Sequence, residues 1–395
     1  MQYEKPSQTA KRLGVTARAI QKWANEGRIK GACKIAGQWM IPADFTEPTE
    51  KNSLVPGKQN QPIRPSFSLI SSDFFPGECL TYVNSLSSED EKNVTYAEYC
   101  YYIGDAERAI RITEAYLQSK DPYLCSTACL IYIFASLGTG HVHQAKYALA
   151  ILQQYLLKTQ NSTASQVPQV KSMSVWLSHA STVLLYCPPL TDEPLENWIK
   201  YLPDGMKLFS CYILAHQMCL VNKFQGAHAV AKIAIEITPG RHVIPEIYCR
   251  LIDAIALINM RHVDDAERQF MSAWKLAQAD GFIEPFAEHY LLLQGIVERC
   301  LKNSYPKEYQ QIKDGAAVFS KHWRSLHNDE ASDNVATELS VTEFSIAMMY
   351  TRNWSAKEIA AHLDMSVRTV YRYISNIYAT LGVRSVAELK EYMLK

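Results

Sequence analysis

The C-terminal stretch of the chain, residues 339–395, carries the pattern that most restricts its fold. Its first half contains two Ser-x-x-Glu sequences, which start at Ser340 and Ser355. In such a capping box the serine side chain accepts a hydrogen bond from the backbone three residues on, and the glutamate side chain bonds back to the serine amide. Each serine therefore marks the start of a helix, and the second of these helices is predicted over residues 355–363.

A longer helix is predicted next, over residues 367–381. Ser366 is placed to cap its start, and Gly382 is placed to end it. Apolar residues at three- and four-residue spacing predict its inward face, and they are Val370, Ile374, Ile377 and Leu381. With a further helix over 386–394, the segment is predicted to be a four-helix unit whose longest helix enters the major groove of DNA.

These residues resemble the C-terminal DNA-binding domain of LuxR/NarL-type bacterial transcription regulators, without a gap. The resemblance is carried by Leu339, Glu343, Ser355, Lys357, Glu358, Ile359, Ala360, Leu363, Ser366, Thr369, Val370, Ile377, Leu381, Gly382, Val383 and Leu389. It implies that 367–381 is the recognition helix and that 386–394 pairs two such domains, so that the protein is a homodimer. The DNA-binding residues implied here are Lys357, Ser366, Arg368, Thr369, Tyr371, Arg372 and Ser375.

Three positions depart from the family pattern. Lysine, histidine and lysine are usual there, and this chain has Tyr371, Tyr373 and Thr380. Fewer cations mean fewer phosphate contacts and a weaker dependence of DNA affinity on salt. Arg372 remains a candidate for bidentate contact with guanine. The alternative is that Arg368 and Arg372 only keep an exposed helix face hydrated.

The N-terminal residues 1–45 predict a second, smaller helix-turn-helix. Gly14 separates a short helix over 7–13 from a helix that Thr16 caps and that runs to Asn25. Two short helices with a tight turn between them are typical of a DNA-binding unit.

The residues after this pair of helices alternate in polarity and predict a small hairpin that bends near Gly37, with Trp39 and Ile41 covering the helices. The whole segment resembles the winged helix-turn-helix of excisionase-type proteins within the MerR superfamily, through Ala10, Leu13, Gly14, Val15, Thr16, Ile20, Trp23, Glu26, Gly27, Arg28, Ile29, Trp39, Met40, Ile41 and Pro42. The DNA contacts that this implies come from Thr16, Arg18, Gln21, Lys22, Arg28, Lys34 and Gln38. The wing often carries arginine where Gln38 and Met40 stand, and docking to a protein is the alternative.

The central residues 69–326 are predicted to be helical throughout and contain a weak internal repeat. Four segments share a turn residue and, five positions later, an alanine near the start of a helix; the alanines are Ala109, Ala145, Ala227 and Ala266. The first two segments start 36 residues apart and the last two 39 apart, near the period of about 34 residues of tetratricopeptide (TPR) repeats. This predicts a TPR-like solenoid whose concave face takes a small-molecule or protein ligand, and the alternative is an irregular helical domain.

The centre also resembles the helical-repeat region of MalT-like regulators. Those regulators carry a nucleotide-binding ATPase module as well, but no G-x-x-x-x-G-K-[ST] run exists in this chain. No nucleotide or other cofactor is therefore expected.

Charge is distributed unevenly, although 40 Lys and Arg balance 40 Asp and Glu. Residues 1–42 carry a net +6 and residues 339–395 a net +2, which leaves the middle at −8. Basic ends favour a polyanion and an acidic middle favours a different partner. Two polar segments are predicted to separate these parts, a Pro-rich linker over 46–68 and an acidic linker over 327–338.

Several patterns that are absent from the sequence narrow the range of expected functions. No run of 18 or more apolar residues or secretion signal is apparent, and ten scattered cysteines form no Cys-x-x-Cys pair, so a cytoplasmic protein is expected. His141 and His143 have no nearby cysteine or acidic ligand, so no metal is expected. No catalytic motif is present, and an enzyme is not expected. The clustered Tyr96, Tyr99, Tyr101 and Tyr102 are interpreted as helix-packing residues rather than a ligand cage.

The sequence thus predicts an all-α cytoplasmic bacterial transcription regulator that binds double-stranded DNA bivalently, through a helix-turn-helix at each end. A ligand or protein on the central repeats is expected to control it. Two other hypotheses remain open at this point. One is a protein-interaction scaffold in which DNA binding is incidental, and the other is an excisionase-like factor that bends DNA.

Overall fold

The computed structural model describes residues 3–25, 29, 32–35, 38–43, 45–46, 67–162, 166–185, 189–237, 240–331 and 334–393. The chain forms two compact units, Met1–Arg64 and Pro65–Lys395. Arg28 and nearly all of the predicted Pro-rich linker, 46–68, lie outside the described residues.

The N-terminal unit combines two helices with a three-stranded antiparallel sheet. In chain order its elements are β1 (Tyr3–Glu4), α1 (Pro6–Leu13), α2 (Ala17–Asn25), β2 (Cys33–Ile35) and β3 (Gln38–Pro42). β3 lies between β1 and β2, and Lys34 pairs with Trp39 across the hairpin. α1 gives way to the turn at Gly14, whose φ of +68° suits a residue without a Cβ atom.

A small apolar core holds this unit together. Its buried members are Ala10, Ile20, Ala24, Ile29, Ile41 and Phe45, and Trp39 is among the side chains packed against them. The indole Nε1 of Trp39 also donates a hydrogen bond to Asn25 Oδ1, at 2.9 Å. The prediction that Trp39 and Ile41 cover the helices is therefore confirmed.

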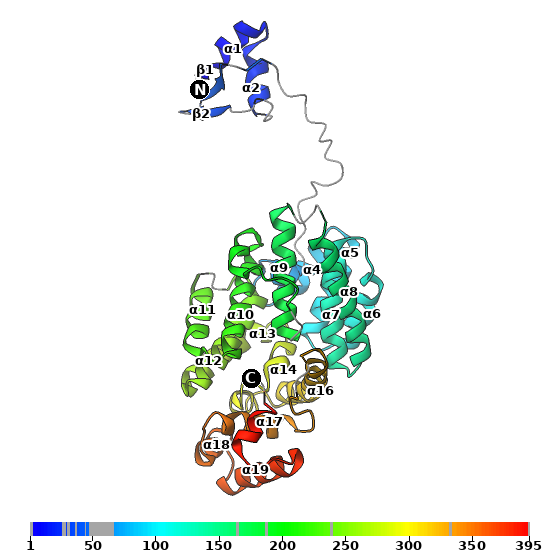
Figure 1. Cartoon of the computed structure of the whole chain (residues 1–395), viewed down its shortest axis with the longest axis vertical. Coiled ribbons are helices and arrows are strands. Elements are labelled where there is room, and N and C mark those ends of the chain that lie inside the picture. The colour runs from blue at the N-terminus through cyan, green and yellow to red at the C-terminus, as the bar shows by residue number, and fades with distance from the viewer. Residues whose placement is uncertain are drawn as a thin grey trace. The chain divides into compact units, whose positions relative to one another are not determined.

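The second unit begins with a body of helices (Figure 1). They are α3 (Ser68–Ser71), α4 (Cys79–Ser85), α5 (Glu89–Tyr102), α6 (Ala106–Thr113), α7 (Pro122–Gly138), α8 (Val142–Gln160), α9 (Pro168–Leu185), α10 (Asp204–Leu220), α11 (Phe224–Ile237), α12 (Val243–Asn259), α13 (Val263–Gln278), α14 (Glu284–His289), α15 (Ile296–Leu301) and α16 (Pro306–Ala331). Helices that follow one another in sequence pack in series, first α5 to α8 and then α10 to α13. Because most of these contacts are between sequence neighbours, the body is built by successive addition of helices.

The four segments of the internal repeat have the same local structure. Their turn residues all have positive φ: +82° at Gly104, +81° at Gly140, +58° at Asn222 and +65° at Arg261. Their alanines, at positions 109, 145, 227 and 266, are all fully buried near the starts of α6, α8, α11 and α13. A methyl side chain at these positions lets the helix approach the preceding one closely.

The last body helix, α16, is longer than the sequence pattern predicts. It continues to Ala331, so the first residues of the predicted acidic linker, 327–338, are helical. Leu326 and His327 are buried at this end of the helix. Asn328 also donates to the carbonyl of Val335, at 2.8 Å, and accepts from its amide, at 2.9 Å. These contacts extend the helix and fix the chain that leaves it.

Four C-terminal helices complete this unit: α17 (Val341–Thr351), α18 (Ala356–His362), α19 (Val367–Leu381) and α20 (Val386–Lys390). The predicted caps are confirmed, because the hydroxyls of Ser340, Ser355 and Ser366 each accept from the amide three residues on. The bounds predicted for α19 are also confirmed. α20 is shorter than the predicted 386–394, since the carbonyl of Tyr392 leaves the helix and accepts from the amide of Ala336.

Candidate nucleic-acid interface

The helices α18 and α19 form a helix-turn-helix. The turn between them contains Asp364, with a φ of +51°, and the amide of Met365 donates to the carbonyl of Ala360 at 3.0 Å. The two helices pack through Ile359 and Val370, which are both fully buried. This packing fixes which face of α19 is left for solvent.

The outward face of α19 carries the predicted DNA-binding residues. Arg368, Tyr371, Arg372 and Ser375 are all exposed, and Tyr371 is 58% exposed. The guanidinium of Arg372 lies 6.0 Å from the ring centroid of Tyr373. Among the described residues, neither Arg368 nor Arg372 forms an ion pair with a carboxylate. The structure thus brings two free cations and a large aromatic ring together on one helix face, a combination suited to phosphates and base edges.

The remaining predicted residues of this segment lie at helix starts. Ser366 Oγ caps α19 by accepting from the amide of Thr369, at 3.0 Å, and the two hydroxyl oxygens are 2.8 Å apart. The serine side chain therefore already has a structural role. Lys357 is exposed in the first turn of α18.

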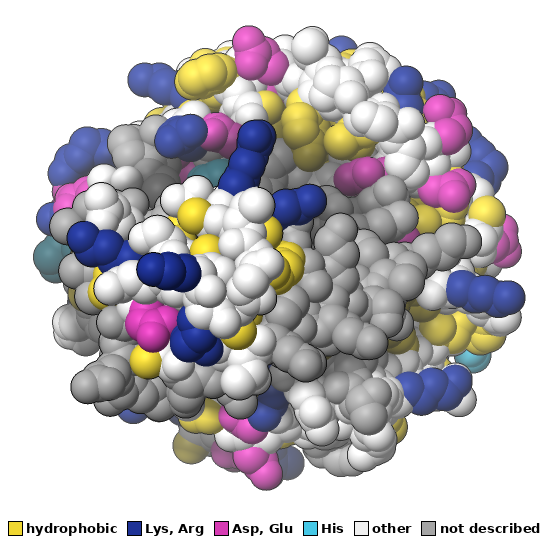
Figure 2. All heavy atoms as spheres, turned by 90° about the horizontal axis from the view of Figure 1, so that it is seen from above, with side chains coloured by type: hydrophobic (Ala, Val, Ile, Leu, Met, Phe, Trp, Pro, Cys, Tyr) yellow, Lys and Arg dark blue, Asp and Glu magenta, His cyan; other side chains and the backbone are white. Residues whose placement is uncertain are grey.

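The N-terminal unit places its predicted residues on two elements. Thr16 Oγ1 accepts from the amide of Ala19, at 3.2 Å, and so starts α2. Arg18, Gln21 and Lys22 are exposed along that helix, and Gln38 is exposed at the start of β3. In Figure 2, Lys and Arg side chains (dark blue) stand out on the described surface. Arg28 lies outside the described residues, and of Lys34 only the strand position is described.

The C-terminal helices are bound to the body by contacts that the sequence did not reveal. Arg261, the turn residue before α13, donates to Glu358 Oε1 and to the carbonyl of Asn353, both at 2.8 Å. Buried His362 has its Nε2 2.6 Å from the carbonyl oxygen of Gln294, so this nitrogen carries the proton. At the adjoining Gly295 a Cβ atom would lie 2.2 Å from a methyl carbon of Leu363, so a side chain there would displace Leu363, and the φ of +92° also favours glycine.

Arg324 in α16 makes a third connection. Its side chain is 1% exposed, and it donates to the carbonyls of Ala336 at 2.5 Å and Leu339 at 3.3 Å. The guanidinium also lies 4.8 Å from the ring centroid of Phe344 in α17. Burial lowers the pKa of Arg324 to about 10, which leaves it charged near neutral pH. In the sequence this arginine stands in a mixed polar stretch without any local signal of burial.

The helix predicted to pair two copies presents few apolar groups. Leu389 of α20 is buried within its own unit, whereas Ala387, Glu388 and Lys390 are exposed. Dimerisation through this helix therefore stays a prediction.

Two other properties concern the described residues alone. None of their helices has the length and apolar character needed to cross a membrane. No group of three or more His, Cys, Asp or Glu side chains among them is placed to hold a metal ion. His141 instead has its Nδ1 3.0 Å from the hydroxyl of Thr139 in a repeat turn.

Comparison with known proteins bears on one part of the chain. Residues 337–393 match the family model described as bacterial regulatory proteins, luxR family. No curated protein and no solved structure matches the chain. The matched residues include all of α17 to α20, with the turn at Asp364 and the exposed face of α19. Residues 337–393 are therefore a LuxR-type helix-turn-helix DNA-binding domain.

Proposed function

We propose that this protein is a transcription regulator that recognises a DNA sequence with α19 and binds a second stretch of DNA with its N-terminal unit. Its helical body is proposed to control this binding. The observation that carries the proposal is the exposed face of α19 in a domain that is already docked on the body. Arg368, Tyr371 and Arg372 remain exposed while Glu358 and His362 of the same domain are engaged with the body. The docked domain can therefore present its recognition helix without first being released.

The reading helix is proposed to act through a small number of contacts. Arg372 is suited to the paired acceptors of guanine, a contact worth about 1–3 kcal/mol of discrimination against other bases. Arg368 and Lys357 are suited to phosphates, which position the domain without reading sequence. Tyr371, where related domains usually have lysine, offers an apolar surface to a thymine methyl group.

The N-terminal unit is proposed to be an excisionase/MerR-like winged helix-turn-helix over residues 1–45. The support is its order of elements, a short helix pair followed by a hairpin, together with the net +6 charge of residues 1–42. Arg18, Gln21 and Lys22 on α2 would face the major groove. Joining two DNA-binding units in one chain raises the affinity by about 10²–10⁴ when both can engage at once.

The body, over residues 69–326, is proposed to be a TPR-like repeat domain that senses a ligand or a partner. The support is the shared structure of its four repeat segments, with a positive φ at each turn and a buried alanine at each helix start. Repeat domains of this kind offer extended binding surfaces. A segment around 327–338 would connect this domain to the DNA-binding domain over 339–395.

The experiment is selection of bound sites from random-sequence DNA by the full chain, followed by affinity measurements on the selected site. We compare the pair Arg368→Ala and Arg372→Ala in α19 with the pair Arg18→Ala and Lys22→Ala in α2. Arg111→Ala, at an exposed position of α6, is the matched control.

The α19 pair is expected to lower the affinity at least tenfold and to abolish the sequence preference. The chain with the α2 pair is expected to keep the sequence preference that α19 confers. It is expected to lose the affinity gained by joining two DNA-binding units in one chain. Unchanged affinity and preference in both pairs would overturn the proposed function. An effect of the α19 pair alone would overturn only its bivalent part.

A further inference from the structure

The interior of the body contains two adjoining cavities. Their volumes are about 40 Å³ and 60 Å³, and Phe134, Leu184 and Glu288 line both of them. At roughly 10–15 Å³ for each water-sized group, each has room for about three to five such groups. The two cavities share these wall residues, and together they offer room for a small ligand.

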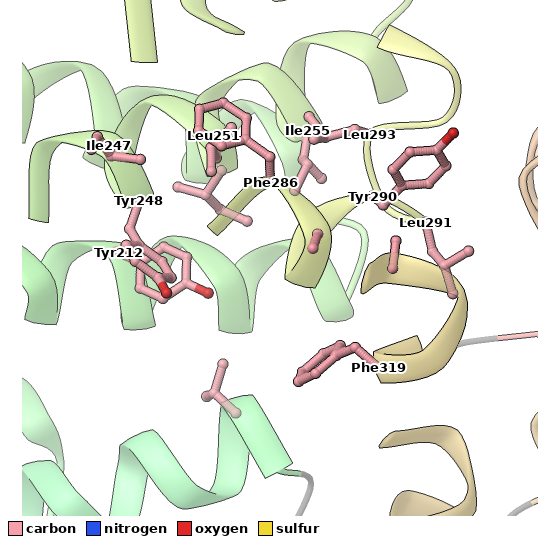
Figure 3. Close-up of a cluster of buried hydrophobic side chains, with 14 of the residues drawn as sticks. Tyr212, Ile247, Tyr248, Leu251, Ile255, Phe286, Tyr290, Leu291, Leu293 and Phe319 are labelled. Carbon is pink, nitrogen blue, oxygen red and sulfur yellow. The ribbon is translucent and has the colours of Figure 1, made fainter. Parts of the chain in front are cut away.

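The walls are aromatic. Besides Phe134, the side chains that line the two cavities include Tyr101, Tyr102, Trp176, Tyr212, Tyr248 and Phe319. The ring centroids of Tyr212 and Tyr248 are 5.1 Å apart, and Figure 3 shows these two rings side by side with Phe319 across from them. Tyr101 and Tyr102, interpreted from the sequence as packing residues, do pack but also line this space.

The lining contains two carboxyl side chains, Glu98 and Glu288, and none of the described Lys and Arg residues lines it. Glu98 is 1% exposed, and although its Oε2 accepts from the amide of Leu69 at 3.1 Å, its Oε1 has no hydrogen-bond partner. An unsatisfied buried oxygen costs about 1–3 kcal/mol, so this atom suits a donor that none of the described residues supplies.

Glu288 is held by tyrosines. Its carboxylate accepts from the hydroxyl of Tyr101 and from that of Tyr248, the latter at 2.9 and 3.0 Å. Another carboxyl, Glu284, lies nearby on the same helix and is itself buried. Burial raises the pKa of Glu98 to about 8 and that of Glu288 to about 7. At neutral pH Glu98 is therefore mostly protonated and Glu288 partly so, and a bound cation would favour the ionised form of both.

A chain of hydrogen bonds fixes the polar groups on the other wall. His289 Nδ1 lies 2.7 Å from the carbonyl oxygen of Pro285, so Nδ1 carries the proton and Nε2 accepts from the hydroxyl of Tyr212, at 2.9 Å. The Tyr212 oxygen can then accept from His216 Nδ1, at 3.1 Å. Both histidines are thereby neutral, since burial lowers the pKa of His216 to about 3 and that of His289 to about 4. They bring no positive charge to the cavity.

We infer that these cavities are the binding site for a small organic cation, an amine or ammonium group on a short apolar body. The aromatic walls suit both the apolar part and the cation, which is attracted to ring faces within about 6 Å. Glu98 and Glu288 supply the negative charge when they ionise, and a bound cation favours their ionised form. The hydroxyl of Ser320 and the indole Nε1 of Trp176, which have no partner either, suit ordered water or a further polar group of the ligand.

The cavity wall continues directly into the contacts that hold the DNA-binding domain. Leu291 and Leu292 line one cavity, and two residues further on the carbonyl of Gln294 accepts from His362. Trp323 in α16 also lines it, and the next residue, Arg324, donates to the carbonyls of Ala336 and Leu339. A ligand that displaces either wall therefore acts on the docked domain. The effect on DNA binding rests on the proposed function, whereas the binding of the cation does not.

The test measures binding of four small probes to the full chain by its intrinsic tryptophan fluorescence, to which Trp176 and Trp323 in the cavity lining contribute. The probes are n-butylammonium, tetramethylammonium, the neutral butan-1-ol and the anionic butyrate. The variants are Glu98→Gln and Glu288→Gln, and Glu107→Gln, at an exposed position of α6, is the control. Circular dichroism verifies that each variant is folded.

The two cations are expected to bind at least tenfold tighter than butan-1-ol, and butyrate is not expected to bind. Either cavity variant should reduce the affinity for the cations at least tenfold and leave that for butan-1-ol within twofold. Equal binding of cations and alcohol, absence of saturable binding, or cation binding unchanged in both variants would overturn the inference. DNA affinity measured without probe separates the two claims, because it tests the proposed function alone.

Discussion

Arg261 and Glu358 lie 97 residues apart in the sequence, and their side chains meet at 2.8 Å, where the helical body touches the LuxR-type domain. Arg261 is the turn residue of the fourth repeat segment, with a φ of +65°. Glu358 completes the capping box of α18, where its other carboxylate oxygen accepts from the amide of Ser355 at 2.7 Å. One glutamate thus both starts a helix of the DNA-binding domain and attaches that domain to the body.

The dual role of Glu358 predicts that substitutions at Glu358 and at Arg261 have unequal effects on stability. Arg261 and Glu358 are 47% and 45% exposed, and an exposed ion pair contributes about 0–1 kcal/mol. Glu358→Ala should cost more than Arg261→Ala, because it also removes a cap worth about 0.3–1.5 kcal/mol. Urea unfolding of the two variants, with Arg111→Ala as control, measures this. A larger loss for Arg261→Ala would contradict the assignment.

Arg324 is predicted to be the stronger connection. Its buried guanidinium satisfies the carbonyls of Ser320, Ala336 and Leu339. Truncation to alanine leaves the carbonyls of Ala336 and Leu339 without this donor, and each buried unsatisfied group costs about 1–3 kcal/mol. Arg324→Ala should therefore lower the free energy of unfolding by about 2–5 kcal/mol and increase proteolysis around Ala336 to Leu339. A loss below about 0.5 kcal/mol, typical of a surface change, would show that the connection is unimportant.

The contrast between these two arginines illustrates what the sequence can and cannot reveal. Capping boxes, the bounds of α19 and the repeat alanines depend on residues within a few positions of one another, so they were predictable. Arg324 and Glu98 are buried by helices distant in the sequence, and nothing adjacent to them signals it. The docking of α18 at Gln294 likewise depends on a close approach that Gly295 permits, and a lone glycine does not indicate which distant helix will approach it.

The buried carboxyls predict a stability that falls as pH rises. Burial raises the pKa of Glu98 and Glu284 to about 8 and that of Glu288 to about 7, all above the ordinary 4.5. The folded state thus holds protons that the unfolded state has released, and stability is lost between about pH 4.5 and 8.

The two buried histidines determine in which part of this pH range the effect of the carboxyls can be measured separately. His216 and His289 have folded pKa values of about 3 and about 4, below the ordinary 6.5, so their contribution is lost only as pH falls below 6.5. Between pH 6.5 and 8 these two histidines no longer contribute, and the three carboxyls act at up to about 1.4 kcal/mol per pH unit for each proton. Glu98→Gln should flatten the slope in urea titrations over this range. A slope identical to that of the parent chain would contradict the buried, protonated state of Glu98.

The exposed face of α19 predicts a specific salt dependence. Each phosphate contact contributes about 0.9 to the slope of log affinity against log salt on duplex DNA. If Arg368 contacts a phosphate, Arg368→Ala should reduce the slope by about 0.9 and lower affinity for all sequences alike. Arg372→Ala should instead relax preference at one base pair by about 1–3 kcal/mol. The reverse assignment of these two effects would show that the helix is rotated relative to the groove.

The two walls shared by the cavities and the docked domain predict coupling between ligand and DNA. Allosteric couplings are typically about 5–150-fold in affinity. Saturating n-butylammonium should change the affinity for a selected DNA site by a factor in this range, and Glu288→Gln should remove the change. Since coupling is reciprocal, DNA should alter the amine affinity by the same factor. A change in one direction only would exclude a binding equilibrium as the cause.

The central claim is that α19 reads sequence at promoters, and genome-wide occupancy by the intact protein tests it most directly. The comparison is with a chain in which Arg368, Tyr371 and Arg372 are all changed to alanine, expressed to the same level. The account predicts discrete peaks at promoters for the intact protein and their loss in the variant. Persistence of the same peaks in the variant would contradict it and would assign sequence reading to the N-terminal unit.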